Sequence, residues 1–176
     1  MISVLRSWKG HGTFLDAAST LLAAGKRKVH FVIAGDGPGR DELAAKLANP
    51  PWKGNVTLLG HRADVPNVLA SLDVLVLPSF AHEGIPQIIL QAQAMLRPVV
   101  ATRIGGIPEV VKDGVTGLLI EPRDAAALAQ KVALLLEDEA LAQRLRKAGR
   151  AQIEARHSLD AMGGPLLALY ERGRPR

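Results

Sequence analysis

The stretch Pro78-Ser-Phe-Ala-His-Glu-Gly-Ile-Pro-Gln-Ile-Ile-Leu-Gln91 decides the fold of this chain, because it joins a strand, a turn and the start of a helix. The apolar run Val74-Leu-Val-Leu77 precedes it, and a helical pattern begins at Pro86, a residue suited to a first helical turn. Between them, the carboxylate of Glu83 stands next to Gly84. Such a turn can hold a phosphate on backbone amides while the acid binds hydroxyl groups. Those are the two needs of a nucleotide-sugar.

Short apolar runs and helical patterns alternate along the rest of the chain. The predicted strands cover residues 2–5, 29–34, 56–59, 74–77, 99–102 and 117–120. The predicted helices cover residues 40–48, 65–71, 87–96, 109–112, 124–136 and 139–156, and residues 49–55 form an exposed loop. The strands are apolar on both faces, as in parallel sheets covered on both sides. The alternation predicts an α/β fold with a right-handed, doubly wound, Rossmann-like parallel sheet.

Length and composition indicate one compact domain. The chain has 176 residues, 48% hydrophobic and 22% charged, with no cysteine, which excludes disulfides and thiolate chemistry. The sequence contains neither a bilayer-spanning apolar run nor a signal-peptide pattern. We therefore expect a protein of the cytoplasm or of the inner face of the cell membrane. Because residues 2–5 follow Met1 directly, we also expect a trimmed fragment.

The formal net charge is +5, and much of it comes from the last third of the chain. The basic residues there are Arg144, Arg146, Lys147, Arg150, Arg156, Arg172, Arg174 and Arg176. They form either a solvated helical face or a surface for peripheral contact with an anionic membrane or polyanion. Nucleic acid is disfavoured as a partner, because only 3% of residues are aromatic and no stacking platform is visible.

Polar and glycine-rich loops follow five successive predicted strands. They cover residues 6–11, 35–39, 60–62, 78–86 and 103–108. Ligands of open α/β sheets bind outside the carboxyl ends of the strands, so five such loops predict a phosphate-binding crevice. The loop Gly35-Asp-Gly-Pro-Gly39 is not G-x-G-x-x-G and lacks an acid at the ribose offset, so we expect no dinucleotide cofactor.

Charged residues in these loops carry the predicted chemistry. Arg6 and Lys9 are either surface charges or, as we favour beside a glycine-rich loop, a clamp on a diphosphate. Glu83 either caps the following helix or bonds sugar hydroxyls, while Gly84 lets backbone amides approach a phosphate. Gln91 either reaches the crevice mouth or is an interior polar residue.

Histidines stand near three of the predicted strand ends. They are His11, His61 and His82. These residues are dispersed in sequence and lack nearby acids, so we predict no metal site.

Seven segments, in this order, carry a resemblance to a known family. They are Trp8-Lys-Gly-His11, Ala34-Gly-Asp-Gly-Pro38, Val56-Thr-Leu-Leu-Gly60, Glu83-Gly-Ile-Pro-Gln87, Pro98-Val-Val-Ala-Thr102, Gly105-Gly-Ile-Pro-Glu-Val-Val111 and Asp113-Gly-Val-Thr-Gly117. The chain resembles the C-terminal, donor-binding half of family 4 retaining glycosyltransferases, which have the GT-B fold. The resemblance covers nearly the whole chain, with the C-terminal helices starting at about residue 124.

The resemblance also implies site roles. In the family motif E-x7-E, the first acid contacts the transferred sugar and matches Glu83, whereas the ribose-binding second acid is replaced by the uncharged Gln91. The family's phosphate-clamping lysine matches Lys9; its usual arginine is replaced by Val4, and Arg6 is the expected substitute. The other residues expected to contact the donor are Gly35, Gly37, Gly60, His61, Arg62, Gly84 and Ile85, with the base against residues 60–62.

The resemblance further implies that the N-terminal, acceptor-binding domain is missing. The parent enzyme would move a sugar from a UDP, GDP or ADP donor to a glycan or lipid-linked acceptor, in cell-surface polysaccharide or lipopolysaccharide synthesis. The fragment alone would transfer nothing. Two alternatives stay open. The first is an inactive interaction module whose basic helices dock on a membrane or partner, which the Val4 and Gln91 departures motivate. The second is a sugar-nucleotide epimerase, which the segment Glu83-Gly-Ile-Pro86 disfavours.

Overall fold

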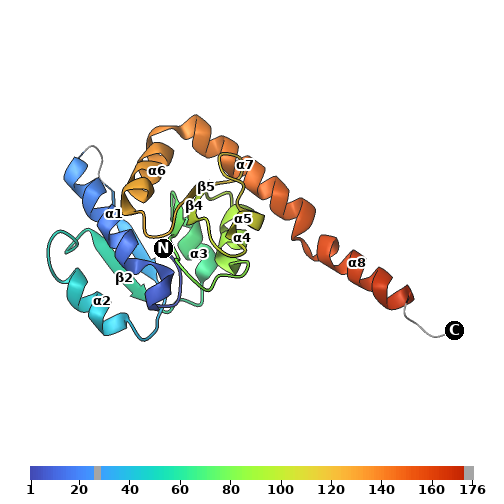
Figure 1. The fold of residues 1–176 in the computed structure, drawn as a ribbon, viewed down its shortest axis with the longest axis horizontal. Helices are drawn as coiled ribbons and strands as arrows, with labels where there is room; N and C mark the ends of the chain where they lie inside the picture. Colours follow the sequence, from blue (N-terminus) through green and yellow to red (C-terminus); the bar gives the residue numbers. More distant parts are fainter. Residues whose placement is uncertain (26–28, 173–176) are drawn as a thin grey trace.

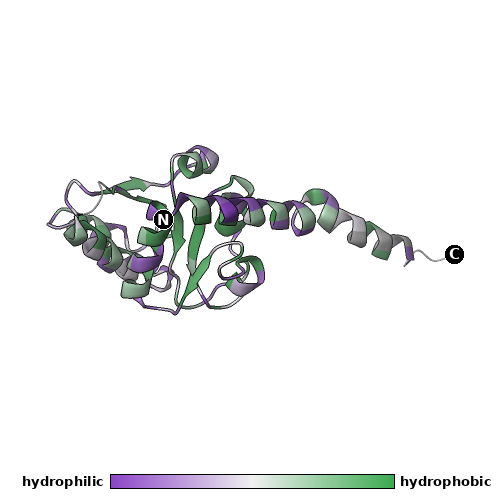
Figure 2. Cartoon of the chain, turned by 90° about the horizontal axis from the view of Figure 1, so that it is seen from above, coloured by the Kyte–Doolittle hydropathy of each residue, from purple (hydrophilic) through white to green (hydrophobic). Residues whose placement is uncertain are grey.

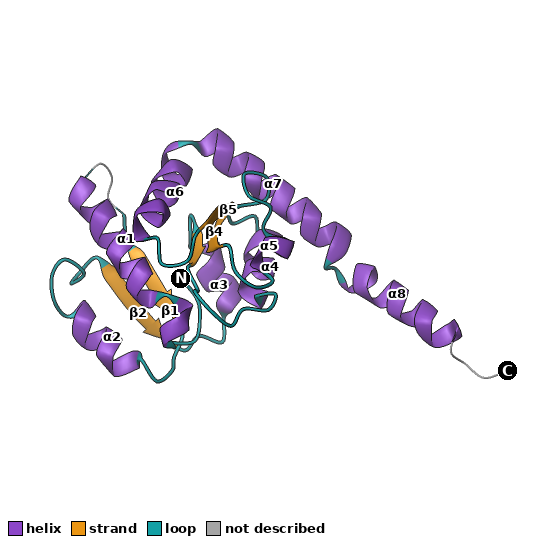
Figure 3. Ribbon diagram, viewed as in Figure 1, coloured by secondary structure: helices purple, strands orange, loops and turns teal. Residues whose placement is uncertain are grey.

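The structure is a computed structural model that describes residues 1–25 and 29–172, in which helices and strands alternate (Figures 1 and 3). The strands are β1 (Phe31–Ala34), β2 (Val56–Gly60), β3 (Leu75–Leu77), β4 (Val99–Thr102) and β5 (Leu118–Ile120). The helices are the 3-10 turn η1 (Ser7–Lys9), then α1 (His11–Ala24), α2 (Arg40–Leu47), α3 (Val65–Ala70), α4 (Gln87–Ala94), α5 (Ile107–Val110), α6 (Ala125–Glu137), α7 (Glu139–Arg156) and α8 (Leu159–Arg172). The predicted α/β class is confirmed.

Every strand pairing in the described residues is parallel, and the strands form two ladders. One sheet joins β1 to β2, and the other has the order β3-β4-β5. The predicted strand at residues 2–5 is wrong, because this segment makes only an isolated parallel bridge between Ile2 and Ala34. Alternate N–H groups still bond along the extension of β1, from Ser3 to Ala34 O and from Leu5 to Asp36 O, and the chain turns only where Arg6 N–H bonds to Val4 O. The segment nevertheless lies along the carboxyl end of β1.

Helices cover both faces of the strands, as the apolar strand pattern predicts. One core combines α1, α2, α6 and α7 with strand residues such as Val76, Val100 and Ile120. The other combines α3, α4 and α5 with Leu75, Leu77 and strand neighbours that point the opposite way. Alternate residues of β3, β4 and β5 therefore enter different cores. In Figure 2 the central strands are hydrophobic and the outer helices carry the hydrophilic residues.

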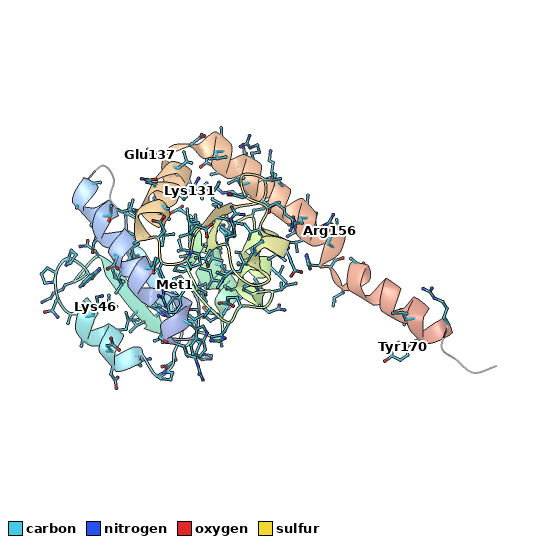
Figure 4. All side chains as sticks on the ribbon, viewed as in Figure 1. Met1, Lys46, Lys131, Glu137, Arg156 and Tyr170 are labelled. Carbon is cyan, nitrogen blue, oxygen red and sulfur yellow. The ribbon has the colours of Figure 1, made fainter. Side chains whose placement is uncertain are left out.

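Two helices were not predicted from the sequence. The helix α1 follows Gly10, whose left-handed backbone (φ 79°) turns the chain out of η1, and it buries Phe14, Leu15, Ala17 and Ala18. The helix α8 continues beyond α7 and projects from the body of the molecule toward the C-terminus (Figure 1). Figure 4 shows Tyr170 on this arm, where its side chain is 70% exposed.

Several helices and strands begin or end a few residues away from their predicted boundaries. The predicted helix at 109–112 is α5, which starts earlier because Pro108 occupies its first turn. The linker at 49–55 is a run of mostly exposed turns, as predicted, although Trp52 is half-buried and donates its indole N–H to Leu15 O at 3.2 Å. In the described part of the chain, no helix combines the length and apolar character needed to cross a bilayer.

Candidate functional site

The structure brings Lys9 and Glu83 together although 74 residues separate them in sequence. Lys9 Nζ lies 2.6 Å from Glu83 Oε1, and the two side chains are only 17% and 5% exposed. The loops that carry them are joined by a backbone hydrogen bond from Phe80 N–H to Trp8 O at 2.8 Å. A β-carbon on Gly10 would stand 1.9 Å from Pro78 O, so only glycine permits this approach.

Buried hydroxyl groups position the Glu83 carboxylate from behind. Ser79 Oγ donates to the same oxygen, Glu83 Oε1, at 2.5 Å. Thr102 Oγ1, at the end of β4, donates in turn to Ser79 O, and both residues are fully buried. The backbone of Glu83 is also supported, because Gly106 N–H donates to Glu83 O at 3.2 Å. The carboxylate is therefore held in one orientation.

Gly105 brings the next loop against the Glu83 loop. It has φ +49°, and a β-carbon there would stand 1.9 Å from Glu83 O. The glycine pair after β4 thus forms the rear wall of the Glu83 loop.

Free backbone amides lie directly beyond this carboxylate. Within residues 1–25 and 29–172, the N–H groups of Gly84, Ile85, Gln87 and Ile88 have no acceptor. A β-carbon on Gly84 would meet nothing within 4 Å, so the space before these amides is open. Gln87 and Ile88 carry orphan donors of the α4 N-terminus, and Gly84 and Ile85 add two donors from the loop before it, so together they attract an anion.

The entry into α4 differs in detail from the sequence-based expectation. Pro86 is the extended N-cap residue (φ −72°, ψ 119°) rather than a member of the first turn. The cap carries no side-chain hydrogen bond, so Glu83 does not cap α4, and that alternative for its role is excluded. Gln91 is exposed on the second turn, so it is not an interior polar residue.

The glycine-rich loop at residues 35–39 has its amides committed to the protein itself. Gly35 N–H donates to Gly60 O at 2.8 Å, and Gly39 N–H donates to Leu5 O at 3.0 Å. Gly37 N–H donates to Asp36 Oδ1 at 2.7 Å. A β-carbon on Gly35 would stand 1.8 Å from Ser3 O. The glycines therefore permit close packing on residues 3–5, and their N–H groups are not free for a phosphate.

A cavity of about 310 Å³ lies where β1 and β2 end. Its lining includes Val4, Gly35, His61 and Arg62, three of which are predicted donor-binding residues. Arg62 Nε and an Nη each donate to Asp64 at 2.7 Å. This hydrogen-bonded pair lowers the pKa of Asp64 and raises the pKa of Arg62. The guanidinium at the cavity rim is thus oriented by a neighbouring acid.

Arg6 and His11 belong to a separate and larger cavity, of about 510 Å³, between α1 and α2. The Arg6 guanidinium lies 5.1 Å from the centre of the Trp8 ring. His11 Nε2 lies 3.3 Å from Ser3 Oγ, and burial lowers the pKa of His11 to about 4. Arg6 therefore shares a loop with Lys9 without sharing its ion pair.

The remaining histidines do not join a metal-binding group. His82 packs edge-on against Trp8, with the ring centres 5.5 Å apart, and His61 is exposed. Among the residues that the structure describes, no three His, Asp or Glu side chains gather as metal ligands would.

The basic helix α7 is partly neutralised by its own acids. Arg146 pairs with Glu139 at 2.7 Å and Arg150 pairs with Glu154 at 2.6 Å. Arg144, Lys147 and Arg156 are exposed. Arg174 and Arg176 lie outside the described residues.

Sequence reasoning missed Ser79, Thr102 and the packing role of Gly105 and Gly106. The contacts of Thr102 and the two glycines link different strand ends, so no spacing rule within one loop reveals them. Ser79 stands one residue after Pro78 and four before Glu83, and that proximity was the one available signal.

The family model "Glycosyl transferases group 1" matches residues 1–138. Alpha-D-kanosaminyltransferase of Streptomyces kanamyceticus is 32% identical over 164 residues, which are 92% of this chain and 42% of that protein. The lipopolysaccharide core biosynthesis glycosyltransferase LpsE of Rhizobium meliloti is 30% identical, over 92% of this chain and 46% of its own. The chain thus spans less than half the length of these relatives.

Solved structures give the same picture. Anabaena Alr3699/HepE in complex with UDP superposes with a TM-score of 0.89 and 26% identity, over 97% of this chain and 47% of that one. Its complex with UDP-glucose gives 0.88. The C-terminal domain of the group 1 glycosyl transferase LpcC from Francisella tularensis gives 0.79 with 27% identity, and the match covers 90% of this chain and 85% of that domain. The similarity thus falls on the C-terminal half of such proteins.

Proposed function

We propose that this chain is the domain that binds the nucleotide-sugar donor. The chain belongs to the group 1 glycosyltransferase family and forms the C-terminal half of a GT-B fold. The convergence of Lys9, Glu83 and the free amides before α4 carries this proposal. A cation, a carboxylate and orphan N–H groups at one edge of a sheet suit a diphosphate joined to a hydroxylated ring. Alr3699/HepE, with the same architecture, has been crystallised with UDP and with UDP-glucose.

Each part of the site takes one part of the donor. The Lys9 ammonium and the amides of Gly84 and Ile85 hold the diphosphate, and they supply the positive charge that stabilises it as the leaving group. Glu83 bonds the hydroxyl groups of the sugar. Arg6 is the second cation in the proposed clamp, reaching in from the neighbouring cavity.

The nucleoside lies toward β1 and β2. The base occupies the 310 Å³ cavity beside residues 60–62, with Gly35, His61 and Arg62 in its wall. Gly37 supports this wall through the packing of its loop on Leu5. Gln91 bonds the ribose without charge. The donor is a UDP, GDP or ADP sugar.

The whole enzyme, which by the length of its relatives is about twice as long, transfers the sugar to a glycan or lipid-linked acceptor with retention at the anomeric carbon. The reaction belongs to cell-surface polysaccharide or lipopolysaccharide assembly. LpsE, named for lipopolysaccharide core biosynthesis, supports that assignment. The acceptor is held by the other half of the enzyme, so this chain alone binds donor and transfers nothing.

Titration of the isotope-labelled chain with UDP, GDP and ADP tests the donor site. We expect one of them to shift the amide signals of Lys9, Gly35, Gly60 and Glu83, while signals of α7 stay in place. If none of the three nucleotides perturbs those loops at about millimolar concentration, the chain does not bind a donor there.

A second candidate is an interaction module without catalysis. It is favoured by Val4 and Gln91, where the family's arginine and second acid are absent, and by the exposed basic residues of α7. Sedimentation with anionic vesicles at low and high salt tests it. Salt-sensitive binding to vesicles, with no response to any nucleotide, would favour this second function.

A further inference from the structure

Glu83 has two hydrogen-bond partners that differ in mobility. Ser79 Oγ and Lys9 Nζ both donate to Glu83 Oε1. Ser79 is fully buried, and its carbonyl is held by the fully buried Thr102. Lys9 is 17% exposed and ends a flexible four-carbon side chain. One partner of the carboxylate is therefore fixed, and the other is free to move.

The movable partner is also the group that a diphosphate needs. In this structure the Lys9 ammonium is already bonded to Glu83, whereas the amides of Gly84 and Ile85 are free. The diphosphate of a nucleotide-sugar carries about one negative charge on each of its two phosphates, more in all than one carboxylate, so an incoming donor competes for Lys9. The carboxylate is only 5% exposed, and Lys9 and Ser79 both bond its Oε1, so only Oε2 is left for sugar hydroxyl groups while the ion pair lasts.

We infer that donor binding exchanges the Lys9–Glu83 ion pair. Lys9 moves to the diphosphate and keeps its proton, Glu83 becomes available to the sugar hydroxyls, and Ser79 holds the carboxylate in place throughout. This inference rests on the proposed function and adds Ser79 to the site as a positioning residue. It predicts that a nucleotide without a sugar must also break the Lys9–Glu83 ion pair. Glu83 then gains no sugar hydroxyl in exchange for Lys9.

Glu83→Gln separates this exchange from a simple contact. Glutamine keeps an oxygen for Ser79 but does not compete for Lys9. We expect the affinity for bare UDP to rise roughly tenfold, while the advantage of UDP-glucose over UDP disappears. If the chain binds GDP or ADP instead, the same comparison is made between that nucleotide and its glucose or mannose ester, in place of UDP and UDP-glucose.

The experiment is isothermal titration of residues 1–176 at fixed ionic strength, since the LpcC C-terminal domain was crystallised as a separate domain. Glu121→Gln is the matched control, because Glu121 follows β5 at the same sheet edge and pairs with Arg103 at 3.4 Å, away from Lys9. It removes the same charge and should leave the UDP affinity within about twofold. If Glu83→Gln does not fold, Glu83→Asp replaces it, with an expected gain of roughly threefold.

Ser79→Ala tests the fixed partner. Because Lys9 still pairs with a now mobile carboxylate, UDP-glucose should lose roughly fivefold in affinity and bare UDP much less. A merely structural role for Ser79 would lower both affinities equally, which would remove it as a positioning residue. Unchanged or weaker UDP binding by Glu83→Gln would overturn the exchange and leave the donor site standing. A native chain that binds no nucleotide would instead defeat the proposed function itself.

Discussion

Two glycine-containing turns at the strand ends have the same appearance in sequence and opposite uses in the structure. In the loop at 35–39, the amides of Gly35, Gly37 and Gly39 already have protein acceptors, and the missing side chains make room for residues 3–5. In the Glu83 loop, Gly84 has open space in front of it and a free N–H group. Glycine permits close approach in both, but the neighbour is the chain itself in one turn and solvent in the other.

The largest expected effect is on stability, at the first of these turns. Gly35→Ala places a β-carbon 1.8 Å from Ser3 O at φ +142°, so we expect the free energy of unfolding to fall by about 3 kcal/mol or more. Urea denaturation followed by circular dichroism measures it. Gly12→Ala, where a β-carbon meets nothing within 4 Å, is the control. A Gly35→Ala protein as stable as wild type would mean that residues 3–5 pack differently in solution.

Lys9→Ala should act on binding at the second turn. We expect nucleoside diphosphate affinity to fall by about 1.5–3 kcal/mol, the value of a charge-assisted contact. Titration calorimetry measures the change, with Lys53→Ala in the exposed 49–55 loop as the control. Equal affinities for the Lys9→Ala and wild-type chains would remove Lys9 from the site.

Gly84→Ala should sharpen the contrast with Gly35→Ala. The new methyl group enters the open space before the free amides, so folding should change by less than about 0.5 kcal/mol. Nucleotide binding should weaken by about 1 kcal/mol, because a phosphate can no longer approach as closely. Thermal unfolding and calorimetry of one sample give both numbers. Loss of stability without loss of binding would mean that Gly84, like Gly35, is needed for packing of the chain and not for ligand binding.

The last expected effect is a pH dependence of stability at His11, at the edge of the first region. Burial lowers the pKa of His11 to about 4 in the folded chain, against an ordinary value of 6.5. As the pH falls from 6.5 to 4, the unfolded chain binds a proton that the folded chain does not, so stability decreases over this range. His11→Gln should flatten that part of the pH profile in urea titrations, whereas the exposed His61→Gln should not. Identical slopes for both variants would place His11 in water.

Sequence alone predicted the α/β class, the five paired strands and the juxtaposition of Lys9 with Glu83. These follow from local apolar patterns and from the rule that parallel strand ends share one edge. The strand predicted at residues 2–5 is only a single bridge at Ile2, and the chain turns where Arg6 N–H bonds to Val4 O, which the local apolar pattern does not reveal.

At the site, the sequence predicted which side chains come together, but it did not predict which backbone N–H groups are free. Whether an amide is free, as in Gly84, or occupied, as in Gly35, depends on which loop lies opposite. Ser79 and Thr102 were missed for the same reason, since their importance comes from a contact between two strand ends.

Gln93 fixes the far end of the helix whose first turn faces the donor site. Its Nε2 donates to Val110 O at 3.0 Å and to Thr116 O at 3.1 Å, and a β-carbon on Gly149 of α7 would stand 3.1 Å from its Cγ. These contacts hold α4 against α5 and α7. If α4 tilted, the buried side-chain amide of Gln93 would lose both of its acceptors. We therefore expect α4 to keep its position when a ligand binds, and any movement to come from side chains and from the η1 loop.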